Sequence, residues 1–314
     1  MKNIKFHIPV LLNTATEYIL NPEIETHTIV DGTTGGGSYS EEIAKRLNVN
    51  CKLICIDKDL NALEFSKNKL TEYSGKIIFI NGNFGNLKKL LNEFNTGIIT
   101  GLILDLGLSE YQLTDEEGFS FMRDTNLDMR ADKEGNLTAD EIVNTYSRFE
   151  LIKIFTEFGE IGNSERLADA IIRYRNVKRI KTTFDLTDAI MSEYKLSDKN
   201  KYDFYAKIFQ SLRIAVNNEL ENLSDALKDS FDMMREGGRI VVVSYHSLED
   251  RIVKNFFKEK SFTPSVSKYG KEALIKNKKL KLITKKAIVP DRKEIFSNPK
   301  SRSAKLRAAE VVWK

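Results

Sequence analysis

Residues 28–37 read TIVDGTTGGG, an apolar run that passes directly into a glycine-rich turn. The apolar run is typical of a buried strand, and the polar and aliphatic mixture after residue 37 is typical of a helix. Glycines let a backbone approach a ligand closely and adopt positive φ angles that side chains disfavour. This stretch therefore predicts the strand, turn and helix that hold nucleoside-like ligands in parallel α/β proteins.

The rest of the first hundred residues repeats the alternation of strand and helix that predicts a parallel sheet. The expected strands are 28–31, 53–57, 77–81 and 101–106, with helices after the glycine turn, after Asp59 and after Phe84. Ligands in such sheets bind beyond the carboxyl ends of the strands. The residues that close these strands are therefore the candidate site residues.

The alternation stops after Gly107, and residues 115–200 show loop and helix patterns without a strand candidate. We interpret 115–200 as a helical insertion for substrate recognition, and 1–114 with 201–314 as one discontinuous core. Apolar residues at helical spacing from Tyr205 to Met234 predict a single long helix that ends at the glycines 237–238. Further expected elements are a strand over 239–244, a helix over 248–260 and a strand over 308–313.

Two aspartates help to choose the ligand of the glycine turn. Asp57 stands twenty residues after Gly37, where an acid can accept hydrogen bonds from both hydroxyls of an adenosine ribose. Asp31 would repel the pyrophosphate of a dinucleotide but would favour a sulfonium and an ammonium group. The sequence therefore favours S-adenosylmethionine over a nicotinamide dinucleotide.

Further candidates follow the other strands. Phe84 could stack on the adenine or could simply begin a helix. Asp105 lies near the end of the fourth strand, with Ser109 and Gln112 after it, where a methyl acceptor would lie. His246 follows the strand at 239–244 and either touches the substrate or has a structural role. We interpret Asp105, Ser109 and His246 as the catalytic group.

The cysteines bear on the acceptor. The chain has two, Cys51 and Cys55, and both precede Asp57 on the expected second strand, away from Asp105. Methylation of a pyrimidine carbon by a cysteine nucleophile is therefore disfavoured, and an exocyclic amine, which needs positioning and no covalent step, is favoured. With three histidines the two cysteines make no convincing zinc site, so no metal is expected.

Charge is divided unevenly along the chain. Residues 254–314 carry 18 Lys and Arg against 5 Asp and Glu, whereas residues 1–253 carry 31 against 40. The basic segment could bind a polyanion or could only solvate a surface. Residues 118–130 combine aromatics with two arginines, which fits either a flipped base and its phosphate or a packed loop with its own ion pairs.

The chain also lacks the apolar core of a signal peptide and any long aliphatic run. We therefore expect a cytoplasmic protein that does not enter a membrane.

Several longer motifs together resemble the ribosomal small-subunit methyltransferase H family, also called MraW. They are HIPVLL at 7–12, the turn at Asp31, DLG at 105–107, residues 118–130, FQSLRI at 209–214, VNNEL at 216–220, SYHSLEDR at 244–251 and NPKSRS at 298–303. The resemblance implies a class I S-adenosylmethionine-dependent methyltransferase fold, Rossmann-like, that methylates the N4 amine of a cytosine in the decoding region of 16S rRNA in the small ribosomal subunit.

The resemblance also implies cofactor contacts, which we combine with those of the turn. The expected set is Asp31, Gly35, Gly36, Gly37, Ser38, Tyr39, Asp57, Phe84, Asp105 and Gln112. The family usually reads Gly-Gly-His where this chain has Gly37-Ser38-Tyr39, and Glu where it has Thr14. Because the backbone N–H of Ser38 and the hydroxyl of Tyr39 can still donate, we expect altered affinity and retained activity.

Two other functions fit the same residues. A ribosome-assembly factor could bind rRNA through the basic segment and keep a vestigial cofactor pocket. An amino-methyltransferase acting on DNA is the second, although the Pro-Pro-aromatic motif typical of that class is replaced by DLGL at 105–108. Whether the chain acts alone or as a homodimer stays open.

Overall fold

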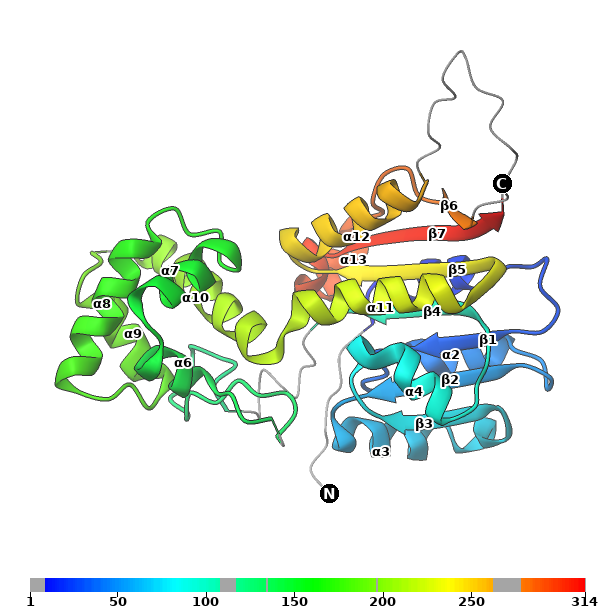
Figure 1. The fold of residues 1–314 in the computed structure, drawn as a ribbon, viewed down its shortest axis with the longest axis horizontal. Coiled ribbons are helices and arrows are strands. Elements are labelled where there is room, and N and C mark those ends of the chain that lie inside the picture. Colours follow the sequence, from blue (N-terminus) through cyan, green and yellow to red (C-terminus); the bar gives the residue numbers. More distant parts are fainter. Residues whose placement is uncertain (1–8, 108–116, 134, 196, 262–277, 314) are drawn as a thin grey trace, which may run out of the picture. The chain divides into compact units, whose positions relative to one another are not determined.

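The computed structural model describes residues 9–107, 117–133, 135–195, 197–261 and 278–313. Their contacts divide them into two compact units, one of residues 9–107 with 220–313 and the other of residues 117–219. We call the first the core and the second the insertion. Figure 1 labels the helices and strands of both.

The core is built on a seven-stranded sheet in the order β3-β2-β1-β4-β5-β7-β6. Strands β1 to β5 pair in parallel, while β7 is antiparallel to both β5 and β6. The strands are β1 (Thr28–Asp31), β2 (Lys52–Asp57), β3 (Ile77–Asn81), β4 (Ile99–Asp105), β5 (Met234–Ser244), β6 (Lys278–Leu282) and β7 (Lys305–Trp313). The predicted α/β class with a mostly parallel sheet is confirmed.

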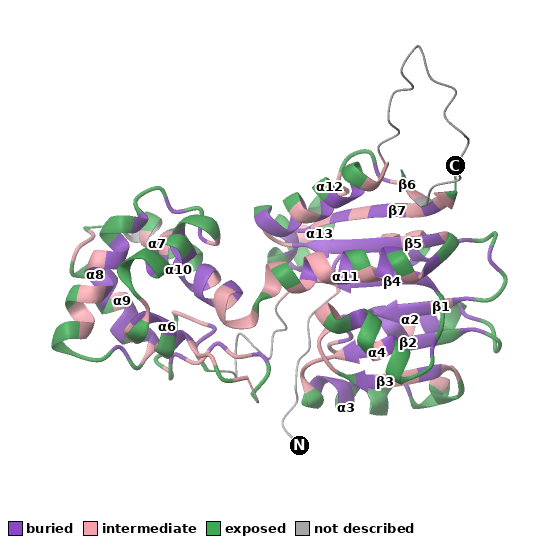
Figure 2. Cartoon of the chain, in the orientation of Figure 1, coloured by how far each residue is buried: buried purple, intermediate pink, exposed green. Residues whose placement is uncertain are grey.

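Helices cover both faces of this sheet because its strands are apolar on both sides. In β4, Leu102 and Leu104 belong to one buried cluster and Ile103 to the other. Figure 2 shows the central strands almost wholly buried. Side chains of α4 (Leu87–Glu93), α11 (Glu219–Met233) and α12 (Ser247–Ser261) belong to the first cluster. Side chains of α1 (Leu12–Ile19) and α2 (Ser38–Arg46), with residues that flank α3 (Leu60–Lys69), belong to the second. Shorter elements are η1 (Thr71–Lys76), η2 (Phe84–Asn86), α13 (Arg292–Ser297) and η3 (Pro299–Ser303).

The insertion is helical in its described residues and has a buried cluster of its own. Its helices are α6 (Ala139–Thr145), α7 (Arg148–Glu157), α8 (Ser164–Val177), α9 (Thr183–Met191) and α10 (Asp198–Asn217). One isolated bridge joins Asn126 to Thr182. Across the described chain, no helix combines the length and apolar character that a membrane span requires.

The long helix expected over Tyr205 to Met234 is two helices, α10 and α11, separated at Asn218. Asn218 has φ 50°, a left-handed conformation that ends helices and that asparagine tolerates better than most residues. Side chains of α10 such as Ile208 and Leu212 pack in the cluster of the insertion. The insertion therefore extends to residue 219, whereas we expected the core to resume at residue 201.

Candidate active site

Three aspartates close parallel strands at one edge of the core sheet. Asp31 ends β1, Asp57 ends β2 and Asp105 ends β4. The backbone couples these ends, since Gly32 N donates to Ile103 O at 3.0 Å and Thr34 N donates to Ile56 O at 3.1 Å. The sequence-predicted acids therefore meet at the edge where α/β proteins bind ligands.

The glycine turn adopts conformations that other residues disfavour. Gly35 and Gly37 have φ angles of 50° and 72°. A Cβ on Gly37 would lie 3.0 Å from Oγ of Ser66, and that hydroxyl donates to the carbonyl of Gly35 at 2.5 Å. A side chain of α3 thus fixes the conformation of the turn. The turn leads into the N-terminus of α2, where the first backbone N–H groups lack intrahelical partners.

Asp31 is 1% exposed and supports the turn from inside. Its Oδ2 accepts the hydroxyl of Ser40 at 2.6 Å, and its Oδ1 accepts the N–H of Thr33 at 3.2 Å. Burial raises the pKa of Asp31 to about 6 despite these hydrogen bonds. Both carboxylate oxygens are thus engaged by the turn itself.

Asp57 is likewise tied to the turn. Its Oδ2 accepts the N–H of Gly35 at 2.7 Å, and its Oδ1 accepts the N–H of Asp59 at 2.9 Å. Burial raises its pKa above the ordinary value. Each carboxylate oxygen has a second lone pair, so the acid can still accept hydrogen bonds from two ribose hydroxyls.

Asp105 differs from the other two acids. Its Oδ1 is buried and accepts no hydrogen bond from the described residues. Burial raises the pKa of Asp105 to about 7. Hydrogen bonds from the Tyr245 hydroxyl and from the backbone at Gly107 lower this pKa but do not cancel the effect of burial. Its own N–H donates to Oγ1 of Thr33 at 2.7 Å. A buried carboxylate without a full set of partners needs an explanation, and a ligand with cationic groups supplies one.

The residues after the turn divide into two kinds. Ser38 begins α2, whereas Tyr39 is 5% exposed, lies in the apolar cluster behind the turn and donates its hydroxyl to the carbonyl of Val10. The tyrosine hydroxyl is therefore occupied, and the backbone is what these positions offer to a cofactor. Phe84 borders the turn, because a Cβ on Gly32 would lie 3.2 Å from the Cβ of Phe84.

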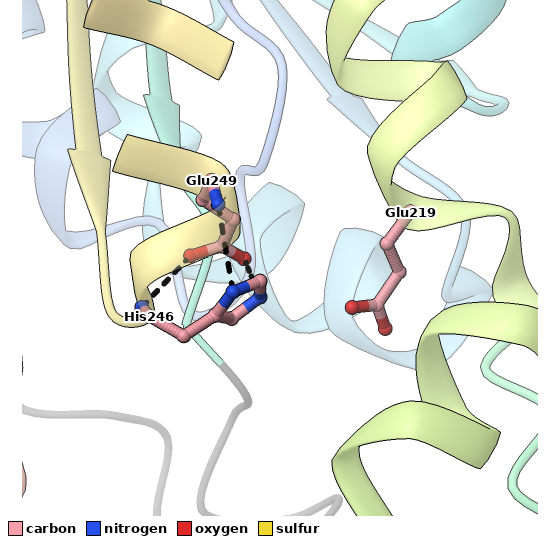
Figure 3. A group of neighbouring side chains, drawn as sticks. All are labelled: Glu219, His246 and Glu249. Carbon is pink, nitrogen blue, oxygen red and sulfur yellow. Dashed lines mark hydrogen bonds and ion pairs between the residues drawn. The ribbon is translucent and has the colours of Figure 1, made fainter. Parts of the chain in front are cut away.

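The segment after β5 places His246 and Glu249 together at the start of α12 (Figure 3). Glu249 Oε2 accepts the N–H groups of Tyr245 and His246 at 2.8 and 3.3 Å, and its Oε1 lies 2.9 Å from Nε2 of His246. Glu249 thereby satisfies backbone N–H groups at the start of the helix, whereas the buried Nε2 of His246 makes no hydrogen bond to the described residues. The sequence did not single out Tyr245 or Thr33, whose side chains both form hydrogen bonds with Asp105, although Tyr245 adjoins the predicted His246.

Other predicted residues are placed differently. Ser109 and Gln112 lie outside the described residues. In the loop at 118–130, Arg130 pairs with Asp128 at 2.8 Å and Phe121 packs on the ring of Phe209. These contacts match the alternative of a packed loop with its own ion pairs.

A family model fits this chain over almost all of its length. The model describes the MraW methylase family and matches residues 4–312. The chain belongs to the MraW methylase family. Three curated relatives are each named ribosomal RNA small subunit methyltransferase H. They are 38% identical in Carboxydothermus hydrogenoformans, 40% in Finegoldia magna and 41% in Caldicellulosiruptor saccharolyticus, with 98% of this chain and 98–99% of each relative covered.

This MraW methylase is thus a methyltransferase, and its cofactor is S-adenosylmethionine. The site fits that molecule on its own chemistry. The glycine turn gives room for close approach, and the unsatisfied Oδ1 of Asp105 lies where a cationic group would be stabilised. The bound cofactor would supply an electrophilic methyl group on its sulfonium.

Proposed function

We propose that this MraW methylase transfers a methyl group to the N4 amine of a cytosine in the decoding region of 16S rRNA. The relatives' name supports RNA of the small ribosomal subunit as the substrate. The observation that carries the proposal is Asp105, a buried acid with an unsatisfied oxygen at the edge of the sheet. A ribosomal substrate implies a cytoplasmic enzyme.

We assign the cofactor to the turn and the acids around it. Asp57 would hold the ribose, Phe84 would pack on the adenine, and Asp105 would face the cationic end. Asp31 would act through the turn that it supports, because it is only 1% exposed and both its oxygens are engaged there. The proposed cofactor site comprises Asp31, Gly35, Gly36, Gly37, Ser38, Tyr39, Asp57, Phe84, Asp105 and Gln112.

The burial of both thiols disfavours a pyrimidine carbon as the methyl acceptor and favours an amine. Cys51 and Cys55 are both buried, and burial raises the pKa of Cys55 far above its ordinary value. Neither is placed as a thiolate nucleophile. An amine needs only acceptors that orient its N–H groups toward the methyl donor, and we assign this to Asp105, Ser109 and His246.

The proposal is tested by binding and transfer together. We expect calorimetry to show binding of S-adenosylmethionine, and radiolabelled methyl transfer to small subunits from a strain that lacks the modification. Binding of subunits without cofactor binding or transfer would instead support an assembly factor. Label in genomic DNA and not in rRNA would support a DNA methyltransferase.

Cofactor affinity should depend on pH through Asp105. A cationic ligand prefers the carboxylate, and with a pKa of about 7 that form is in the minority at pH 6 and predominates at pH 7.5. We therefore expect the Kd for S-adenosylmethionine to fall several-fold from pH 6 to pH 7.5. Calorimetry at both pH values checks this, and Asp105→Asn should flatten the dependence. An unchanged dependence in that variant would remove Asp105 from the explanation.

A further inference from the structure

The core carries a basic groove between α12 and the segment that follows β6. The groove has a volume of about 350 Å³, and five cations line it: Lys254 and Lys258 of α12, Lys285 and Lys286 after β6, and Arg307 of β7. No acidic residue is among those described residues that line it. We call these five residues and the space between them the basic groove.

The charge of the groove is largely uncompensated. Asp250 pairs with Arg307 at 2.6 Å and with Lys305 at 3.2 Å. The four groove lysines are exposed, and none pairs with an acid within the part of the chain that the structure describes. Lysines at i and i+4 on α12 repel each other. Such a cluster is stabilised when it binds an anion.

The groove also offers more than charge. Leu282 and Ala287, both half-buried, add apolar surface to its lining. A phosphodiester chain with its sugars presents charged, polar and apolar groups in close succession, and single-stranded nucleic acids are bound by such mixed basic surfaces. This favours a nucleic acid strand over a small inorganic anion.

The groove begins close to the proposed active site. Helix α12 starts at Ser247, directly after His246, and Lys254 and Lys258 follow seven and eleven residues later. At a rise of 1.5 Å per residue these lysines lie roughly 10 and 16 Å along the helix from its start. A few nucleotides of an extended strand span that separation, so one strand could occupy the edge and the groove together.

We propose that the basic groove binds backbone phosphates of the RNA strand that flanks the methylated nucleotide. This inference rests on the proposed function, because it takes the strand at the sheet edge to be RNA. The groove would give affinity and register, while the edge would select the base.

The test compares two double variants, each of which replaces a pair of adjacent lysines and so removes two positive charges. K285Q/K286Q removes two groove cations, and K88Q/K89Q is the control, since those lysines are exposed on α4 beside Glu93, Asp225 and Asp229. The probe is a fluorescein-labelled single-stranded RNA of about twenty nucleotides, titrated over a range of salt. Losing two phosphate contacts should make the slope of log K against log salt shallower by about 1.4. The control should keep the wild-type slope.

Transfer assays complete the test. In K285Q/K286Q the KM for small subunits should rise several-fold, more than the KM for S-adenosylmethionine, and thermal unfolding should stay unchanged because the lysines are exposed. Equal slopes and equal KM values for the two double variants would contradict the proposal that the basic groove binds RNA. So would a K285Q/K286Q variant that loses binding to anionic vesicles but keeps its binding to RNA. If the wild type transfers no methyl group to rRNA the proposed function fails, whereas the RNA slopes still decide whether the groove binds phosphates.

Discussion

Asp105→Ala is expected to lower the rate of methyl transfer by at least roughly 100-fold, because displacing groups at a reaction centre by even about 1 Å costs that much. The reason is the carboxylate oxygen that accepts no hydrogen bond from the described residues. In our account this oxygen meets the cofactor's cationic end and helps to orient the acceptor amine. Single-turnover transfer to small subunits, at saturating cofactor, measures the effect.

The fold should survive this substitution. The pKa of Asp105 is raised to about 7, so the folded state binds its proton more tightly than the unfolded state does. The stability that this gives is present at low pH and is lost as the pH rises through 7, so removing the carboxylate should not lower the melting temperature at pH 8.

Tyr245→Phe, which removes a hydrogen bond to Asp105, should give a smaller loss of rate than Asp105→Ala. The exposed acid Glu64 provides the control, Glu64→Ala. Equal rates for Asp105→Ala and the wild type would contradict this role.

Asp57→Ala is expected to weaken S-adenosylmethionine binding roughly 10- to 100-fold, the equivalent of about 1.5–3 kcal/mol for hydrogen bonds to a charged group. Two effects add. The ribose loses its acceptor, and the turn loses the bond from Gly35 N to Asp57 Oδ2. Calorimetry at one pH gives the Kd directly.

Asp57→Asn separates the two contributions, because the amide keeps one oxygen that can accept the Gly35 N–H. We expect it to bind the cofactor with an affinity between those of Asp57→Ala and the wild type. A Kd for Asp57→Ala within twofold of the wild type would show that the ribose binds elsewhere.

The parallel core could be predicted because its strands are buried on both faces and therefore read as apolar runs. Strands β1 and β3 begin and end at the predicted residues, and Asp31 and Asp57 close their strands as expected, whereas β4 ends at Asp105, one residue earlier than expected. The edge strand β6 was missed. Its sequence KKLKL alternates lysines with leucines and resembles a solvated basic tail more than a strand.

Other features depend on contacts that a single sequence does not display. The apolar spacing runs through Asn218 without interruption, so only its left-handed conformation reveals two helices. Tyr39 carries a hydroxyl suited to a ligand, yet that group bonds to Val10. The sequence likewise showed that residues 254–314 are basic, but the gathering of Lys254, Lys258, Lys285 and Lys286 around one groove requires the pairing of β6 with β7.

Nucleoside mass spectrometry after transfer by the purified protein shows directly which nucleoside is methylated. Unmethylated small subunits are incubated with S-adenosylmethionine, and the RNA is digested and mapped. We predict N4-methylcytidine in the decoding region of 16S rRNA with the wild type and none with Asp105→Ala. A different methylated nucleoside, or no methylation of rRNA by a protein that binds the cofactor, would contradict the account.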